Sequence, residues 1–342
     1  MASHRRPRQP GRARVSVLTA TAAAAVAITS QAAQAAPQPS KNDVKAKVDK
    51  LYEEAEMATE KYNGAKEKQE RLEEEVSNLQ DKVARGQEDL NDLRNGLGSM
   101  ATAQYRSGGI DPSVQLLLSS DPDTYLERAS TLNQLSGKQA EALGRITGKQ
   151  RTLQQQRAEA AGKLGELDTT REALGEKKRE IQGKLATARA LLNTLTAAER
   201  AELAAEEDRA NRSAGERVDL GSAVPESQRA AAALSAAQSK IGAPYVWGAT
   251  GPSSFDCSGL TSWAYSQAGV GISRTSQAQA NDGTRIGRSA LKPGDLVFFY
   301  GDLHHVGLYA GNGQILHAPK PGANVRYESI NNMPFQFGVR IG

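Results

Sequence analysis

The 342-residue chain contains a single cysteine, Cys257, and few aromatic residues. One cysteine cannot form a disulfide within the chain, so a disulfide framework is excluded. Of the 16 aromatic residues, 12 lie between Tyr245 and Phe337, and the stretch from Lys41 to Lys240 contains four, all of them tyrosines. A compact mixed core is therefore expected only in the C-terminal third of the chain.

The chain also lacks a general excess of one charge. Its formal net charge is +4, but the first 36 residues contain five arginines and no acidic residue, and the remainder carries a net charge of −1. Basicity therefore does not indicate a nucleic-acid partner, and no basic patch interleaved with aromatic residues suggests one. No P-loop or dinucleotide-binding glycine pattern is present, so no nucleotide cofactor is predicted.

No apolar run is long enough to span a membrane. The longest, Val15 to Ile28, has about 14 residues, whereas a transmembrane helix needs roughly 20. It follows the arginines and precedes Ala33-Gln34-Ala35, a small-residue cleavage pattern, so residues 1–35 are predicted to be a secretory signal peptide. Arg5-Arg6 also suggests a twin-arginine signal, but the next residues favour the general export route. We therefore expect a secreted protein, extracellular or associated with the cell wall.

Residues 41–205 carry apolar residues at steps of four and three, the pattern of a coiled coil. One seam runs from Val44 to Met100, and a second, spaced at sevens, runs from Ile146 to Leu195. The segment Ser107 to Pro112 ends the first helix, and Ser120-Asp-Pro122 begins the next. Two seams joined by such a turn predict an antiparallel helical hairpin.

The charged faces of this hairpin suggest a solvated spacer that holds another domain away from a surface. Its tip carries an apolar patch of Val114, Leu116, Leu117, Leu118 and Tyr125. Such a patch is either covered by the turn, or docks onto a partner or back onto the C-terminal domain. The heptad pattern then stops, and residues 206–225, which are polar and contain glycine and proline, are predicted to be a flexible linker.

Residues 226–342 have the size of an ordinary domain. An alanine-rich helix is predicted over residues 228–241, and a second helix starts at Cys257. Short candidate strands follow at residues 295–300, 304–309, 314–317, 325–328 and 337–341. Helices followed by strands predict an α+β domain with an antiparallel sheet.

Cys257 is a candidate nucleophile, because a lone thiol in an oxidising compartment would be replaced by serine or alanine without loss if it were only structural. Apolar residues from Leu260 to Ala268 recur behind it at helical spacing, so Cys257 lies in the first turn of a helix. Asp256 is predicted to cap this helix rather than to act as a catalytic acid. The partial positive charge of a helix N-terminus favours thiolate, so we predict an ionised Cys257.

A cysteine nucleophile needs an imidazole base that a further group orients. Apart from His4, the histidines lie on one predicted hairpin, at His304, His305 and His317. If residues 311–313 form a three-residue loop, position 317 faces 307, and His317 lies on the same face as His305 within side-chain reach. A two-residue loop would separate the pair, and we favour the first arrangement. His304 points to the other face and is not assigned to the triad.

A metal site is the competing interpretation, since Asp302, His304, His305 and His317 include zinc-ligand types. Their spacing matches neither the helical histidine pair of zincins nor a close cysteine pair. We therefore predict a catalytic triad of Cys257, His305 and His317, with no metal and no cofactor.

Six short blocks occur in the C-terminal third: Pro244-Tyr-Val-Trp-Gly248, Phe255-Asp-Cys-Ser-Gly-Leu260, Arg274-Thr-Ser-Gln277, Leu291-Lys-Pro-Gly-Asp-Leu-Val-Phe-Phe299, His305-Val-Gly-Leu-Tyr309 and Ile315-Leu-His-Ala-Pro319. In this order they resemble the blocks of the NlpC family of cell-wall cysteine endopeptidases. The resemblance implies a small papain-like fold, with the triad on the three residues already named. It also implies that Tyr245 assists the oxyanion hole. Trp247, Ser258 and Ser276, within the same blocks, are expected to bind substrate.

This resemblance implies hydrolysis of peptidoglycan stem peptides, typically between D-γ-glutamate and the diamino acid. The family usually has Gly-Gly after the tryptophan, where this chain has Gly248-Ala249, a change that could alter the substrate groove. A helical hairpin before such a domain resembles the actinobacterial Rip-type endopeptidases, in which the coiled coil is thought to restrain the enzyme and mediate recruitment. A cell-envelope or division protein is therefore an expected partner. The alternative is a non-catalytic coiled-coil adaptor whose C-terminal domain only binds wall peptides.

Overall fold

The computed structural model describes residues 39–106, 114, 118, 122–213 and 218–342. The predicted signal peptide and the tip residues Leu116 and Leu117 lie outside these ranges, and the side chain of Tyr125 is likewise not described. Within the described ranges, no helix has the length and apolar character needed to cross a membrane.

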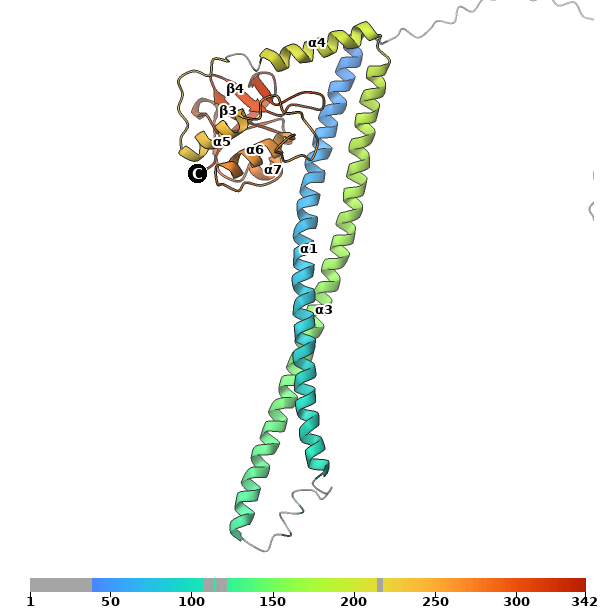
Figure 1. Ribbon diagram of the computed structural model, residues 1–342, viewed down its shortest axis with the longest axis vertical. Helices are drawn as coiled ribbons and strands as arrows, with labels where there is room; N and C mark the ends of the chain where they lie inside the picture. The colour runs from blue at the N-terminus through green and yellow to red at the C-terminus, as the bar shows by residue number, and fades with distance from the viewer. Residues whose placement is uncertain (1–38, 107–113, 115–117, 119–121, 214–217) are drawn as a thin grey trace, which may run out of the picture. The chain divides into compact units, whose positions relative to one another are not determined.

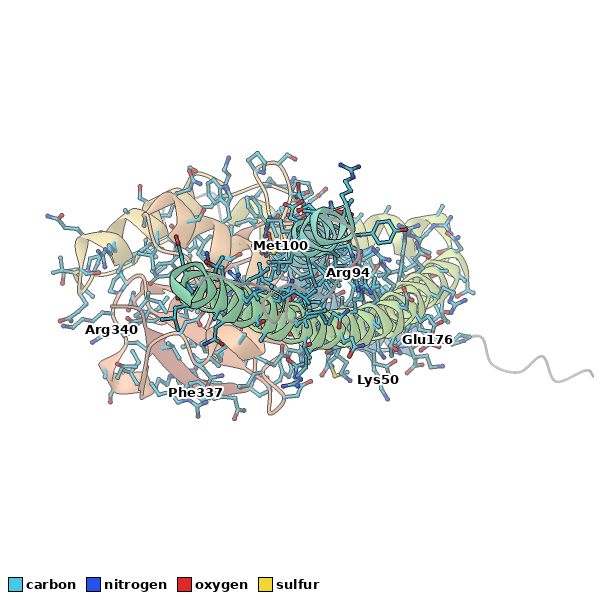
Figure 2. All side chains as sticks on the ribbon, turned by 90° about the horizontal axis from the view of Figure 1, so that it is seen from below. Lys50, Arg94, Met100, Glu176, Phe337 and Arg340 are labelled. Carbon is cyan, nitrogen blue, oxygen red and sulfur yellow. The ribbon has the colours of Figure 1, made fainter. Side chains whose placement is uncertain are left out.

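Two long helices, α1 (Lys41–Arg106) and α3 (Pro122–Asn193), form the predicted antiparallel hairpin (Figure 1). The two seams face each other, so that Val44 and Val48 pack with Ala188, and Leu90 packs with Ile146 and Leu153 nearer the tip. Charged side chains flank the seam and are exposed, as Figure 2 shows for Lys50, Arg94 and Glu176. The heptad pattern therefore predicts this part of the fold correctly.

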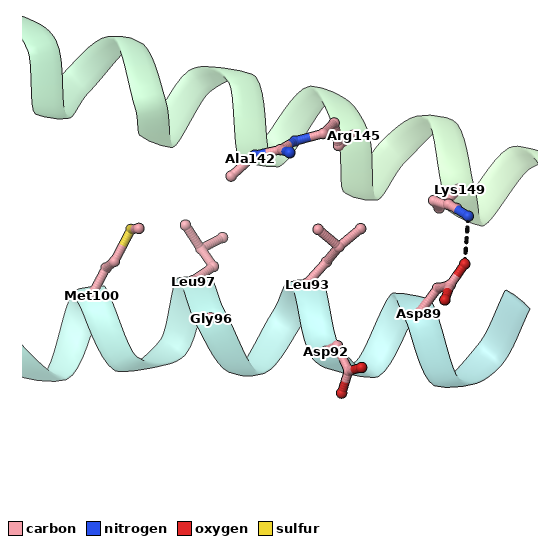
Figure 3. Close-up of a pocket in the computed structure, with 9 residues that line it drawn as sticks. All are labelled: Asp89, Asp92, Leu93, Gly96, Leu97, Met100, Ala142, Arg145 and Lys149. Atoms are coloured by element: carbon pink, nitrogen blue, oxygen red, sulfur yellow. Dashed lines mark hydrogen bonds and ion pairs between the residues drawn. The ribbon is translucent and has the colours of Figure 1, made fainter. Parts of the chain in front are cut away.

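The seam opens toward the tip of the hairpin. Leu93 and Leu97 are only half-buried, and Met100 is 41% exposed. Their side chains point toward Ala142 and Arg145 of α3 across a cavity of about 570 Å³ (Figure 3). Apolar surface is thus available on the described part of the tip.

A third helix, α4 (Ala197–Ser213), follows α3 after a short turn. Glu202 and Glu206 of α4 form ion pairs with Lys41 and Lys45 at the start of α1. The predicted linker, residues 206–225, is therefore wrong in its first part, because residues 206–213 continue this helix. Ion pairs with α1 stabilise α4 where the heptad pattern has already ended.

The C-terminal domain has the predicted α+β architecture. Its helices are α5 (Gln228–Gln238), α6 (Cys257–Gln267), α7 (Ser276–Gln279) and the 3-10 helix η1 (Arg288–Ala290). Its strands are β1 (Thr284–Ile286), β2 (Leu296–Phe299), β3 (His305–Gly311), β4 (Gln314–His317), β5 (Arg326–Ser329) and β6 (Phe335–Arg340). They form one antiparallel sheet in the order β1-β6-β2-β3-β4-β5. The short strand β1 was not predicted.

Helices α5 and α6 pack on one face of the sheet. Apolar residues of both helices, such as Leu234 and Leu260, share a buried cluster with Phe298, Leu308 and Leu316 of the strands. The opposite face has its own buried cluster, covered mainly by loop residues. The N-terminus of α6 thus lies against the strands that carry the histidines.

The hairpin between β3 and β4 has the predicted register but a different turn. Leu308 pairs with Leu316, which places position 317 opposite 307 as predicted. The loop, however, is the two-residue turn Asn312-Gly313, whose φ angles of 47° and 71° are those of a type I′ turn. A bulge between Tyr309 and Gly311 shifts the register by one residue. The three-residue loop was therefore wrong, and the bulge is what keeps both histidines on one face.

Candidate active site

Cys257 is the first residue of α6 and is 1% exposed. Asp256 caps the helix as predicted, because its Oδ1 accepts a hydrogen bond from the backbone N–H of Gly259 at 2.6 Å. The same carboxylate pairs with Arg274 and accepts the N–H of Gly248. These bonds hold the preceding loop and place the sulfur at the start of the helix.

His305 and His317 lie together on neighbouring strands. Nε2 of His305 is 2.7 Å from Nδ1 of His317, and Nε2 of His317 is 3.2 Å from Oε2 of Glu328 on β5. A carboxylate can only accept, so His317 donates its Nε2–H to Glu328 and accepts the Nε2–H of His305. The chain of bonds fixes the tautomer of His317 and leaves Nδ1 of His305 facing the site. Glu328 was not predicted, since only strand pairing brings β5 beside β4.

His304 lies apart from this chain, as predicted. Its Nδ1 bonds to Asp302, and its ring stacks on Tyr300 with a centroid separation of 4.2 Å. Its carbonyl oxygen, however, lies 3.6 Å from the sulfur of Cys257. The backbone of His304 therefore contacts the nucleophile although its ring does not join the triad.

A polar face of α1 is buried against the residues of the predicted triad. Oε1 of Glu56 lies 2.5 Å from Nδ1 of His305. The Cys257 sulfur, a ring nitrogen of His305 and a carboxylate oxygen of Glu56 all lie within 4.8 Å of one another. A side chain from the hairpin thus lies within 4.8 Å of both the predicted nucleophile and the predicted base.

Glu60 lies one turn further along α1 and is 2% exposed. Its carboxylate accepts hydrogen bonds from the C-terminal domain. Its Oε1 accepts the hydroxyl of Ser258 at 2.7 Å, and its Oε2 accepts the N–H of Ser276 at 2.7 Å and the Ser276 hydroxyl at 3.0 Å. Oε1 also lies 3.8 Å from the sulfur of Cys257. Two predicted substrate-binding residues therefore bind a carboxylate, and that carboxylate belongs to the protein.

The next turn of α1 completes the contact. Nδ2 of Asn63 donates to Oδ2 of Asp256 at 3.0 Å. The ring of Tyr62 packs edge-on against Trp247, with centroids 5.3 Å apart. Trp247, the third predicted substrate-binding residue, is thus also covered by α1.

The prediction of an ionised Cys257 is wrong for this state. Burial raises the pKa of the Cys257 thiol well above its usual range, and the carboxylates of Glu56, Glu60 and Asp256 raise it further. The helix N-terminus would favour thiolate, but its partial charge is outweighed by desolvation and three nearby anions. Burial also raises the pKa of Tyr245, followed by the effect of Glu56 and Cys257, so its hydroxyl stays protonated and able to donate.

His305 and His317, the two histidines of the predicted triad, differ in the direction of their pKa shifts. Burial alone would lower the pKa of His305, but the Glu56 carboxylate outweighs it, so this pKa is raised. Burial lowers the pKa of His317, and the bond to Glu328 only partly opposes this effect. His305 therefore carries the positive charge, with Glu56 as its counter-ion.

Docking of α1 also places Glu60 where its ionisation is opposed. Burial raises its pKa to about 7, and the neighbouring Asp256 adds to the rise, while the bonds from Ser258 and Ser276 oppose it. Docking of α1 is therefore less favourable in free energy when Glu60 is charged than when it is protonated.

Besides Glu328, four site residues on α1 were not predicted from the sequence: Glu56, Glu60, Tyr62 and Asn63. They recur at helical spacing beside the apolar seam, but acidic and amide residues occupy such positions throughout α1. No local pattern separates a carboxylate that enters an active site from one that is solvated. Burial identifies Glu56, Glu60 and Asn63, whereas Tyr62 is half-buried and is identified by its contact with Trp247.

The comparison with known proteins concerns the C-terminal third. Residues 242–339 match the NlpC/P60 family. A probable endopeptidase of Corynebacterium glutamicum is 52% identical over 119 residues, which make up 35% of this chain and 57% of that protein. A probable endopeptidase of Mycobacterium tuberculosis is 45% identical over 95 residues, 28% of this chain and 25% of that protein. The chain thus spans little more than half of the first relative and a quarter of the second.

Several solved structures also match this region. The crystal structure of the NlpC/p60 domain of the peptidoglycan hydrolase SagA is 40% identical to it, and the match covers 33% of this chain and 98% of that chain with a TM-score of 0.32.

Proposed function

Because this chain carries an NlpC/P60 domain over residues 242–339, we propose that it is a secreted cysteine endopeptidase that hydrolyses the stem peptides of peptidoglycan. The observation that carries the proposal is the hydrogen-bonded chain of His305, His317 and Glu328, which ends next to Cys257. A binding module has no need of a buried imidazole oriented toward a thiol.

The proposed mechanism is acyl transfer. Cys257 gives its proton to His305, and the sulfur attacks the carbonyl carbon of the stem peptide. The backbone N–H of Cys257 and the hydroxyl of Tyr245 are the donors proposed for the oxyanion. The C–N bond then breaks as His305 protonates the leaving amine, and water hydrolyses the thioester with His305 as base. His317 and Glu328 orient His305 and stabilise its charge throughout.

The bond cut is proposed to join D-γ-glutamate to the diamino acid. A γ-linked glutamate keeps its α-carboxylate free, so its site must offer donors to a carboxylate near the nucleophile. The hydroxyls of Ser258 and Ser276, with the N–H of Ser276, are such donors, and they already hold the Glu60 carboxylate. This arrangement supports the assignment of these residues to substrate binding, with Glu60 in the place of the substrate.

We assign α1 the role of an inhibitory element. Glu56 occupies the space beside His305, Glu60 takes the carboxylate donors, and Tyr62 covers Trp247. Inhibition is then both steric and electrostatic, because the same carboxylates keep the thiol of Cys257 protonated. Activity requires that this segment of α1 leave the site.

Recruitment and release are proposed to act through the hairpin tip. Exposed apolar side chains gather on the described part of the tip, at Met100, Tyr105, Val114, Leu118, Leu126 and Leu143. An exposed apolar surface at the end of a charged rod favours docking to a protein. We propose a cell-envelope or division protein as the partner that pulls α1 from the site.

The test is digestion of purified peptidoglycan by the chain from residue 39 onward. Replacing Glu56, Glu60 and Asn63 together by Ala should raise the rate of product release at least about tenfold by shifting the population toward the open state. The matched control replaces Glu74, Asn78 and Asp81 by Ala, since these residues have the same chemistry and spacing but are exposed on the same helix. Mass spectrometry of the products identifies the bond.

Cys257→Ala in the released background should remove all cleavage. If the released protein yields no soluble product while it still binds the wall, the adaptor alternative is correct and the peptidase proposal is rejected. If the control triple variant is as active as the released one, the inhibitory role of α1 is rejected.

A further inference from the structure

Three different kinds of metal-ligating side chain converge where α1 meets the catalytic domain. Within the described part of the chain, Glu56, Cys257 and His305 form one group whose carboxylate oxygen, sulfur and ring nitrogen lie within 4.8 Å of one another. All three residues are buried, with exposures of 8%, 1% and 1%. Two ligands come from the catalytic domain and one from the hairpin, so the set is complete only when α1 is docked.

The charge around this group favours a cation. Glu56, Glu60 and Asp256 place three carboxylates near the sulfur, while Arg274 is the cation paired with Asp256. Oε1 of Glu60 lies only 3.8 Å from the sulfur. A divalent ion would be balanced by the Glu56 carboxylate and the Cys257 thiolate together.

The surroundings already orient the imidazole as metal sites require. A ligating histidine commonly donates its second ring N–H to another group, which fixes its tautomer. Nε2 of His305 has such a partner in Nδ1 of His317, so Nδ1 is the nitrogen that faces Glu56. No rotation of the ring is needed to present Nδ1 to an ion.

We propose that Glu56, Cys257 and His305 bind Zn²⁺ and that the ion locks the closed state. A mixed set of thiolate, imidazole and carboxylate suits Zn²⁺, with water as fourth ligand. Binding releases the thiol proton of Cys257 and the proton shared by Glu56 and His305 to solvent, and it involves no redox step. This inference rests on the proposed function, since it makes Zn²⁺ a regulator of that site.

The required movement is small. Bonds of about 2.0–2.3 Å in tetrahedral geometry separate the ligand atoms by about 3.3–3.7 Å. The 2.5 Å contact between Glu56 and His305 therefore opens by about 1 Å as the ion replaces a hydrogen bond. A rotation of the Glu56 side chain supplies this distance, so α1 stays docked.

The test measures metal binding by the chain from residue 39 onward, without substrate. Zn²⁺ affinity is obtained by competition with a chromophoric chelator, and Co²⁺ is used as a spectroscopic probe of thiolate ligation. Glu56→Gln should weaken Zn²⁺ binding by more than about tenfold, since even outer-shell changes cost about 10–100-fold. Cys257→Ser should also remove the thiolate-to-cobalt absorption. Glu53→Gln, exposed on the same helix, should leave the affinity unchanged.

Absence of Zn²⁺ binding in the unmodified protein would overturn the site, and so would equal affinity in the Glu56→Gln variant, which would leave only a thiol and imidazole pair. These failures are distinct from failure of the proposed function. If the chelator-treated Glu56, Glu60 and Asn63 triple variant cleaves peptidoglycan while the unmodified protein binds no Zn²⁺, the peptidase stands and the zinc site falls. If that variant does not cleave, the peptidase proposal falls whatever the binding constant.

Discussion

The Glu56 carboxylate lies 2.5 Å from Nδ1 of His305, although the two residues are 249 positions apart in the chain. In cysteine peptidases the nucleophilic thiolate pairs with the protonated imidazole. Here Glu56 takes the place of the thiolate as counter-ion. Because Cys257 and Glu56 compete for one positive charge, our proposal implies that docking of α1 suppresses the nucleophile even before it excludes substrate.

Removing the two buried carboxylates should make Cys257 reactive. The thiol is 1% exposed, and its pKa is raised by burial and then by Glu56 and Glu60. In the Glu56→Gln, Glu60→Gln variant we expect alkylation by iodoacetamide near neutral pH to be at least about tenfold faster, since one pKa unit changes the thiolate fraction about tenfold. Mass spectrometry of the peptide containing Cys257 gives the rate.

The matched variant is Glu74→Gln, Asp81→Asn, which removes the same charge from exposed positions of α1. It should label at the rate of the unmodified protein. Equal labelling rates in both double variants would show that these carboxylates do not control the thiol.

Docking of α1 should weaken as pH rises. The pKa of Glu60 is raised from 4.5 to about 7 when docked, chiefly by burial. When docking raises the pKa of a carboxyl group, the protonated group favours the docked state. This contribution to the free energy of docking is complete below the pKa of the undocked group and is lost as pH rises through the pKa of the docked group. The raised pKa of His305 acts in the same direction, as Glu56 outweighs burial there. The fraction of molecules with α1 undocked should therefore begin to rise above pH 4.5 and continue to rise through about pH 7.

Fluorotryptophan labelling makes this opening visible by NMR. Trp247 packs against Tyr62 of α1, whereas Trp263, the other tryptophan, packs against Phe255 and serves as internal reference. The Trp247 signal should shift with pH, and Glu60→Gln should flatten that shift. A Trp247 signal that is constant from about pH 5 to 8 would contradict the prediction.

His317 and Glu328 should act by positioning His305. In the variant released by the Glu56, Glu60 and Asn63 substitutions, His317→Ala should lower kcat by about 10²-fold or more with little change in KM. Glu328→Gln should move the acid limb of the kcat/KM profile to lower pH, because the Glu328 charge helps to raise the pKa of His305. An unchanged acid limb, with an unchanged Tm, would assign Glu328 a structural role only.

Gly259 should be intolerant of any side chain. A Cβ at this position would lie 2.1 Å from the carbonyl oxygen of Ala249 and 2.7 Å from Oδ1 of Asp256. Gly259→Ala should therefore destabilise the domain by about 1–3 kcal/mol and lower Tm, as overpacking commonly does. Gly271→Ala is the control, since its Cβ would meet no atom within 4 Å. Equal Tm values for the two variants would contradict this account.

Several features of the C-terminal domain could be predicted from the sequence, because they depend on residues that are close together in the chain. The cap at Asp256 and the apolar residues behind Cys257 place the nucleophile at a helix start, and strand alternation places His305 and His317 on one face. The turn between them was predicted incorrectly, since a two-residue turn with a bulge gives the same register as a three-residue loop. Loop length alone cannot distinguish these two solutions.

The order of helices and strands and the heptad seams depend on residues close together in the chain, so periodicity and short motifs were enough to predict them. Which face of α1 meets the catalytic domain depends on packing between segments about 200 positions apart, and no local pattern encodes it. That packing alone decided that Glu56 and Glu60 enter the site. It also decided the ionisation of Cys257, because burial and neighbouring carboxylates outweigh the partial charge of one helix end.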